Sequence, residues 1–96
     1  MQSEWKFADP QNTAVITTKK IIEGASIMFV SHDEDDGGWQ FLEAETAPAE
    51  ADAAVVGLKD VVAMDDSILE LADLPVGWSA KRDDVGGTWR RIKSAR

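Results

Sequence analysis

The sequence predicts an α+β fold in one domain, with a small antiparallel sheet and one or two short helices packed on one face. Two observations lead to this prediction. Short runs rich in β-branched and aromatic residues alternate with turns of aspartate and glycine, a pattern typical of antiparallel strands. Two later stretches instead have the apolar spacing of short helices. Ninety-six residues, 44% of them hydrophobic, are enough for one modest core, and we expect less order over residues 1–12 and 93–96.

The first third of the chain predicts two strands joined by a short connection. Residues 13–18, TAVITT, are β-branched and favour a strand. The following KKIIEG predicts either a single helical turn or an irregular connection, closed in both cases by Gly24. Residues 26–32, SIMFVSH, have apolar side chains in both alternating sets, so we expect a central strand covered on both faces.

A hairpin is predicted over residues 26–43. Asp-Gly and Gly-Gly at positions 36–38 favour a type I′ turn, which needs positive φ at both central residues. Residues 39–43, WQFLE, then form a strand in which Trp39 and Phe41 share one face. We expect both aromatic side chains to be substantially buried.

The second half predicts a loop over 44–52 that contains Pro48, with a frayed helix as the alternative. A short strand over 53–56 and a helical stripe at Leu58, Val61 and Val62 follow. A second helix follows, because Asp65 or Ser67 can cap it, Glu70 can complete a capping box with Ser67, and Pro75 stops it. Residues 78–82 and 88–92 predict a closing hairpin around a turn at 83–87, and we expect the tail from Lys93 to be frayed.

The net charge of −8 is unevenly distributed. Residues 1–80 hold 16 acids and 4 lysines, net −12, whereas residues 81–96 hold 6 bases and 2 acids, net +4. Because binding to nucleic acid depends on basic side chains, we expect no nucleic-acid partner and favour a basic protein. Although Trp89-Arg90-Arg91 mixes an aromatic ring with bases, we expect Trp89 to be a core residue.

The sequence also bears on compartment and membrane association. Without cysteine, it offers neither a disulfide framework nor a thiolate site. Residues 1–12 lack the pattern of a signal peptide, and no apolar run is long enough to span a bilayer, so we expect a cytoplasmic protein without membrane contact. The oligomeric state stays open.

The run of acids at Asp33, Glu34, Asp35 and Asp36 is the candidate partner-binding site. Either it is a docking surface for a basic protein, or it is a solvated hairpin turn. His32 allows an alignment to a calcium-binding loop, with Gly37 at the invariant glycine, but histidine is a poor first ligand and the flanks predict strands. His32 is also a possible general base, yet Ser31 beside it should point to the opposite face. We therefore expect no metal, no cofactor and no catalytic residue.

Several short motifs together resemble a family of small bacterial domains of unknown function that includes predicted immunity proteins of polymorphic toxin systems. The matching positions are Val15 to Ile21, Asp33 to Gly37, Gly38-Trp39-Gln40-Phe41, Leu58 to Asp65, and Leu74-Pro75-Val76-Gly77 with Arg82. The chain departs from the family pattern at His32 and at Trp78. The resemblance implies a domain that binds another protein and carries no catalytic residues. It favours a non-enzymatic immunity-type protein that neutralises a basic toxin, and the alternative is a small structural or accessory domain without a dedicated ligand.

Overall fold

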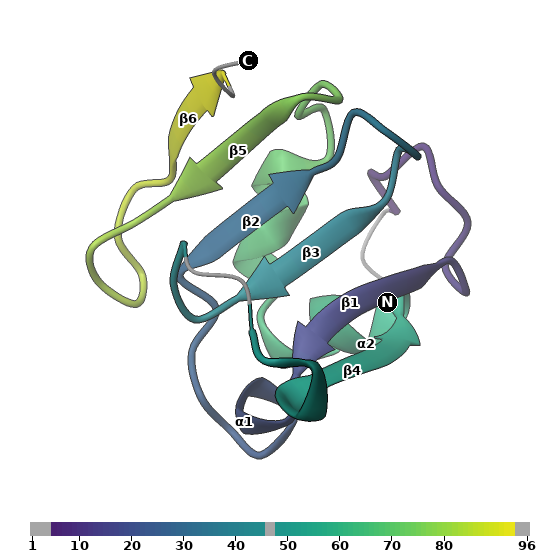
Figure 1. Cartoon of the computed structure of the whole chain (residues 1–96). Coiled ribbons are helices and arrows are strands. Elements are labelled where there is room, and N and C mark those ends of the chain that lie inside the picture. The colour runs from purple at the N-terminus through teal and green to yellow at the C-terminus, as the bar shows by residue number, and fades with distance from the viewer. Residues whose placement is uncertain (1–4, 46–47, 94–96) are drawn as a thin grey trace.

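The computed structural model describes residues 5–45 and 48–93. The elements, in chain order, are β1 (Ala14–Thr18), α1 (Lys19–Ile22), β2 (Phe29–His32), β3 (Trp39–Leu42), the 3₁₀ helix η1 (Glu50–Asp52), β4 (Ala53–Gly57), α2 (Leu58–Met64), the 3₁₀ helix η2 (Asp66–Leu71), β5 (Trp78–Lys81) and β6 (Arg90–Lys93). The six strands form one sheet in the order β4-β1-β3-β2-β5-β6. Figure 1 shows α2 and the helical segment that follows it behind one face of the sheet, and the opposite face is largely uncovered in the described part of the chain. The predicted α+β class is confirmed.

The strand pairing combines predicted hairpins with one long-range contact. Both hairpins are present, because β2 pairs with β3 and β5 pairs with β6 in antiparallel fashion. The prediction did not include the parallel pairing of β1 with β3, in which Ile16 lies opposite Gln40. A parallel neighbour requires a crossover, and here α1 and β2 make that connection between β1 and β3.

The hydrophobic core lies between the sheet and the helices. Val30 lies opposite Phe41 and Ala80 in the neighbouring strands, and all three are completely buried. Trp39 precedes Phe41 by two residues, shares its face and is 2% exposed, so the predicted burial of both aromatic residues is confirmed. α2 and η2 contribute four more buried side chains, Leu58, Val61, Ile68 and Leu71, and α1 contributes Ile21.

Two predictions about the first hairpin are wrong. Helices cover β2 on one face only, so Phe29 and Ser31 on the other face remain half-buried. The connection to β3 is also longer than a type I′ turn, because residues 33–38 separate the two strands. Only Gly37 in this loop has a positive φ, at +73°, and its N–H donates to the Asp33 carbonyl at 2.9 Å. A wider turn of this kind needs one residue in the left-handed region rather than two.

The predicted capping box of the second helix is also wrong. Asp65, not Ser67, caps this helix, by accepting a hydrogen bond from the Ser67 N–H at 3.0 Å. The Ser67 hydroxyl is instead engaged by Arg82 and Trp89, which come from the closing hairpin. Tertiary contacts therefore replace the local contact with Glu70, and η2 forms as a 3₁₀ helix.

The structure describes the N-terminal segment from residue 5 and the C-terminal segment up to residue 93. Residues 1–4 and 94–96 lie outside the described part, whereas Phe7 is 4% exposed and belongs to the core. Phe7 meets Trp39 edge to face, with ring centroids 5.2 Å apart. Among the described residues, no helix combines the length and the apolar character needed to cross a bilayer.

Candidate functional site

The acidic turn, defined here as residues 33–36, forms one wall of an open hollow between β2 and β3. Asp33 is half-buried, and the other three carboxylates are exposed. The hollow has a volume of about 270 Å³ and is lined by the acidic turn together with Ser31, His32, Gln40 and Gly77. The predicted docking residues are thus brought together at one end of the sheet.

Two of the four carboxylates hold the turn in shape. The Asp33 carboxylate accepts hydrogen bonds from Ser31 Oγ and Gln40 Nε2, both at 2.8 Å, which tie the turn to the uncovered face of the sheet. Asp36 Oδ1 accepts from the Gly38 N–H at 2.8 Å, a local bond that favours the turn conformation. Local structure is a sufficient reason for an acid at both positions.

The other two carboxylates have no such role. Glu34 and Asp35 are exposed, and their carboxylates make no hydrogen bond or ion pair with another described residue. The Glu34 side chain lies over Gly77, where a Cβ would be 3.7 Å from the Glu34 carboxyl carbon. Glu34 and Asp35 are therefore the charges of the acidic turn that remain free for a cation from outside.

The basic residues near the C-terminal end are largely compensated within the chain. The ion pairs among the described residues are Lys81–Glu45, Arg82–Asp65, Arg90–Asp83 and Arg91–Asp73. Hydrogen bonds from Arg91 and Arg90 lower the pKa of the Asp73 and Asp83 carboxyls respectively. The acidic turn takes part in none of these pairs, so no described residue of the basic segment offsets its negative charge by contact.

His32 connects the acidic turn to the segment after η2. Its ring stacks on Trp39, with centroids 3.8 Å apart and an interplanar angle of 13°. Nδ1 lies 2.7 Å from the Leu74 carbonyl oxygen, and Nε2 lies 3.2 Å from that of Gly37. The Ser31 hydroxyl donates to the Asp33 carboxylate and makes no hydrogen bond with the His32 ring, although both residues line the hollow. The contacts of His32 are those of a packing residue that positions the turn.

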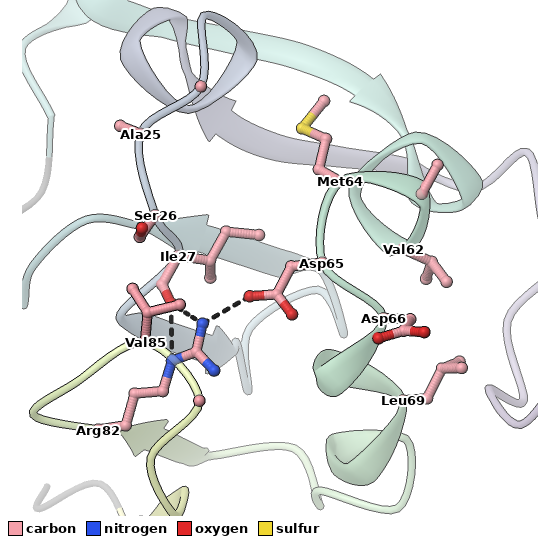
Figure 2. Close-up of a pocket in the computed structure, with 13 residues that line it drawn as sticks. Ala25, Ser26, Ile27, Val62, Met64, Asp65, Asp66, Leu69, Arg82 and Val85 are labelled. Atoms are coloured by element: carbon pink, nitrogen blue, oxygen red, sulfur yellow. Dashed lines mark hydrogen bonds and ion pairs between the residues drawn. The ribbon is translucent and has the colours of Figure 1, made fainter.

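A larger hollow lies at the other end of β2, and the sequence did not predict it. It has a volume of about 730 Å³ and lies between the end of α2 and the loops at 24–27 and 85–86. Figure 2 shows Met64 and Val85 on different sides of this hollow, where they are 43% and 66% exposed. Its base contains the buried side chain of Arg82.

Arg82 joins four segments of the chain at the base of this hollow. Its Nε and Nη2 donate to the Ile27 carbonyl at 3.1 and 2.8 Å, and Nη2 also pairs with Asp65 (Figure 2). Its Nη1 donates to the Ser67 hydroxyl at 3.0 Å, and its guanidinium carbon lies 4.4 Å from the centroid of the Trp89 ring. Every guanidinium nitrogen has a partner within the chain, so Arg82 is a structural residue.

Asp65 is held in its charged form by these contacts. Burial removes solvent from the carboxylate and by itself raises the pKa of Asp65. Hydrogen bonds from Ser67 and Arg82, with the positive charge of Arg82, outweigh that effect and lower the pKa of Asp65 below its ordinary value. The ion pair is therefore fully formed at neutral pH.

Sequence reasoning identified both partners of this ion pair for other reasons. Asp65 stood out as a helix cap and Arg82 as the arginine of the family pattern, but no local spacing couples residues 17 positions apart. No local signal marked Arg82 as buried, because it follows Lys81 at the end of the strand WSAK; once buried, its guanidinium requires a carboxylate or carbonyl partner.

Two further questions are whether the described residues could hold a metal ion and whether the chain resembles a known protein. Within residues 5–45 and 48–93, no group of three or more His, Asp or Glu residues is placed to hold a metal ion. The flanks of the acidic turn are the strands β2 and β3, not the helices of a calcium-binding loop. No protein-family model matches the chain, and searches of curated proteins and of solved structures found no match.

Proposed function

We propose that this chain is a non-enzymatic protein-binding domain that docks a basic partner through the acidic turn. Within this class we propose an immunity-type role in the cytoplasm, in which the partner is a basic toxin that the bound domain neutralises. The observation that carries the proposal is the charge of Glu34 and Asp35, which are exposed beside a hollow and make no hydrogen bond or ion pair with another residue within 5–45 and 48–93.

Electrostatics supports a basic partner in particular. The chain carries a net charge of −8, and the ion pairs near its C-terminal end offset much of the local positive charge. Complementary charge at the edge of an interface accelerates encounter and favours one orientation of the partner. The acidic turn is anchored by its own hydrogen bonds, so its two free carboxylates present a defined arrangement to that partner.

A second candidate function is a structural or accessory domain without a dedicated ligand. The roles of Asp33 and Asp36 favour it, because the turn needs these two acids for its own hydrogen bonds. Their presence is explained without any binding protein. Docking of a basic partner requires the charges of Glu34 and Asp35, whereas an accessory domain does not. The experiment therefore removes these two charges.

The test neutralises only the free charges. Glu34→Gln with Asp35→Asn removes two charges and leaves the hydrogen bonds of the turn in place, whereas replacing all four acids would also disturb the turn. The control is Glu70→Gln with Asp84→Asn, which removes two exposed carboxylates elsewhere on the chain. Partners are captured on the immobilised chain, with the product of a neighbouring reading frame as the first to examine, and their binding rates are measured at several salt concentrations.

We expect a basic protein whose association rate is reduced in the Glu34/Asp35 variant and whose binding becomes less dependent on salt. The Glu70/Asp84 control should bind like the unmodified chain. For the immunity role, the chain should also inhibit the toxic activity of that partner in equimolar amounts. A partner that binds both variants equally would contradict docking at the acidic turn, and failure to find any basic partner would favour the accessory domain.

A further inference from the structure

The two edges of the sheet differ in their protection against another strand. β6 has the sequence Arg-Arg-Ile-Lys, whereas β4 has Ala-Ala-Val-Val-Gly and no charged residue. Basic side chains on an edge strand discourage pairing with a second molecule. By this criterion the β6 edge is protected and the β4 edge is not.

The hydrogen bonds of β4 identify the backbone groups that it leaves open. The Leu58 N–H donates to the Thr13 carbonyl at 2.8 Å, in continuation of the antiparallel register between β1 and β4. Because hydrogen-bonding direction alternates along a strand, Val56 and Ala54 also bond toward β1. The N–H and C=O groups of Val55 therefore point away from the sheet.

The two ends of β4 are closed by contacts within the chain. The Gly57 N–H donates to Asp60 Oδ2 at 3.1 Å, and the Ala53 N–H donates to the Ala49 carbonyl at 3.2 Å. The opening is thus centred on Val55, whose side chain is 71% exposed. A strand that pairs here would gain its main hydrogen bonds at this one residue.

We propose that two copies of this chain associate through β4, antiparallel and about a two-fold axis at Val55. In this register each Val55 exchanges two N–H···O=C bonds with the Val55 of the second copy. Ala53 lies opposite Gly57 and Ala54 opposite Val56, so small and apolar residues meet along the whole strand and no like charges oppose each other. The pairing joins two six-stranded sheets into one continuous sheet.

Charges at the ends of β4 favour a second copy of this chain as the occupant. In the antiparallel arrangement, the end of β4 in one copy lies beside the start of β4 in the other. The exposed Lys59 at the start of α2 therefore comes near Glu50 and Asp52 of the second copy's η1. Asp60 at the same end is turned toward the Gly57 amide. The association does not depend on the proposed function, because the acidic turn lies between β2 and β3, away from the β4 edge.

The absence of cysteine permits a direct test. In the proposed register the Cα atoms of the paired residues lie roughly 5.5 Å apart, within the range that a disulfide spans. Val55→Cys should therefore form a disulfide-linked dimer under mild oxidation. Val85→Cys is the matched control, since Val85 is 66% exposed but lies in the turn before β6, and it should remain mostly monomeric.

A second measurement does not depend on cross-linking. Sedimentation of the unmodified chain should give an average mass that rises from monomer toward dimer with concentration. Val55→Lys should abolish this rise, because it places a charge at the axis, whereas Ile92→Lys on β6 should leave it intact. The proposal is overturned if the unmodified chain stays monomeric at every concentration, or if the two cysteine variants cross-link to the same extent.

Discussion

Replacing Arg82 by methionine tests whether the buried ion pair holds the fold together. Methionine keeps an unbranched apolar side chain against Trp89 but removes all the guanidinium hydrogen bonds. The Ile27 carbonyl, the Asp65 carboxylate and the Ser67 hydroxyl then each lose a partner that the native structure supplies. The change therefore leaves the Asp65 carboxylate without its cation and the Ile27 carbonyl without its guanidinium donors.

The expected loss of unfolding free energy follows from the burial of the pair. The Arg82 side chain is 1% exposed and that of Asp65 is 22% exposed, so the surviving carboxylate is poorly solvated. Breaking a buried ion pair from one side costs about 3–5 kcal/mol. Domains of this size have a total stability of about 5–15 kcal/mol, so Arg82→Met should remove a large share of it.

Lys81 provides a matched control at the preceding position. Its ion pair with Glu45 is exposed, with 36% and 64% of the two side chains accessible, and such pairs contribute about 0–1 kcal/mol. Urea unfolding followed by tryptophan fluorescence should therefore show a small change for Lys81→Met and a large one for Arg82→Met. Equal effects of the two substitutions would refute the structural role of Arg82.

A double-mutant cycle then measures the coupling between the two charges. Asp65→Asn keeps an oxygen that can cap η2 but removes the negative charge. If the pair acts as a unit, the loss in the double variant with Arg82→Met should be clearly smaller than the sum of the two single losses. Additive losses would show that Arg82 acts through the Ile27 carbonyl and Trp89 instead.

Three further predictions follow from the same structure. Trp39→Ala should cost about 3–5 kcal/mol in urea unfolding, because a buried indole is removed; a near-neutral effect would contradict its place in the core. Folding lowers the pKa of Asp65 below the ordinary value of 3.8, so the stability that its charge contributes is present above that value and lost as the pH falls through the folded value. The stability difference between the unmodified chain and Asp65→Asn should therefore persist at neutral pH and shrink only as the pH falls below 3.8, and a difference that stays constant there would exclude this linkage. Gly37→Ala should cost about 1–2 kcal/mol in urea unfolding through its φ of +73° alone, since no atom blocks a Cβ there, and Gly37→Asn should cost less in the same assay.

Local patterns were sufficient for most of the secondary structure. The strand at residues 13–18, the two hairpins and the helix that begins at Leu58 were predictable, because each depends on propensities and side-chain alternation within a few residues. The burial of Trp39 and Phe41 follows from the same alternation once their strand is recognised. The acidic turn was also apparent as a candidate docking site from its run of carboxylates.

Other features depend on how the hairpin closes. Asp33 bonds to Ser31, two residues earlier, and to Gln40, which lies beside Ser31 only once β2 and β3 are paired in their observed register. Sequence alone could not separate the structural pair, Asp33 and Asp36, from the free pair that the binding experiment now targets.

The short elements and the excess of negative charge follow from composition and local order. The parallel contact of β1 with β3, the ion pair of Arg82 with Asp65, and the exposure of β4 as an uncharged edge arise only when the chain folds. All three have one cause. Strand order and the partner of a buried charge are selected by how the whole chain packs, and no short segment contains that information.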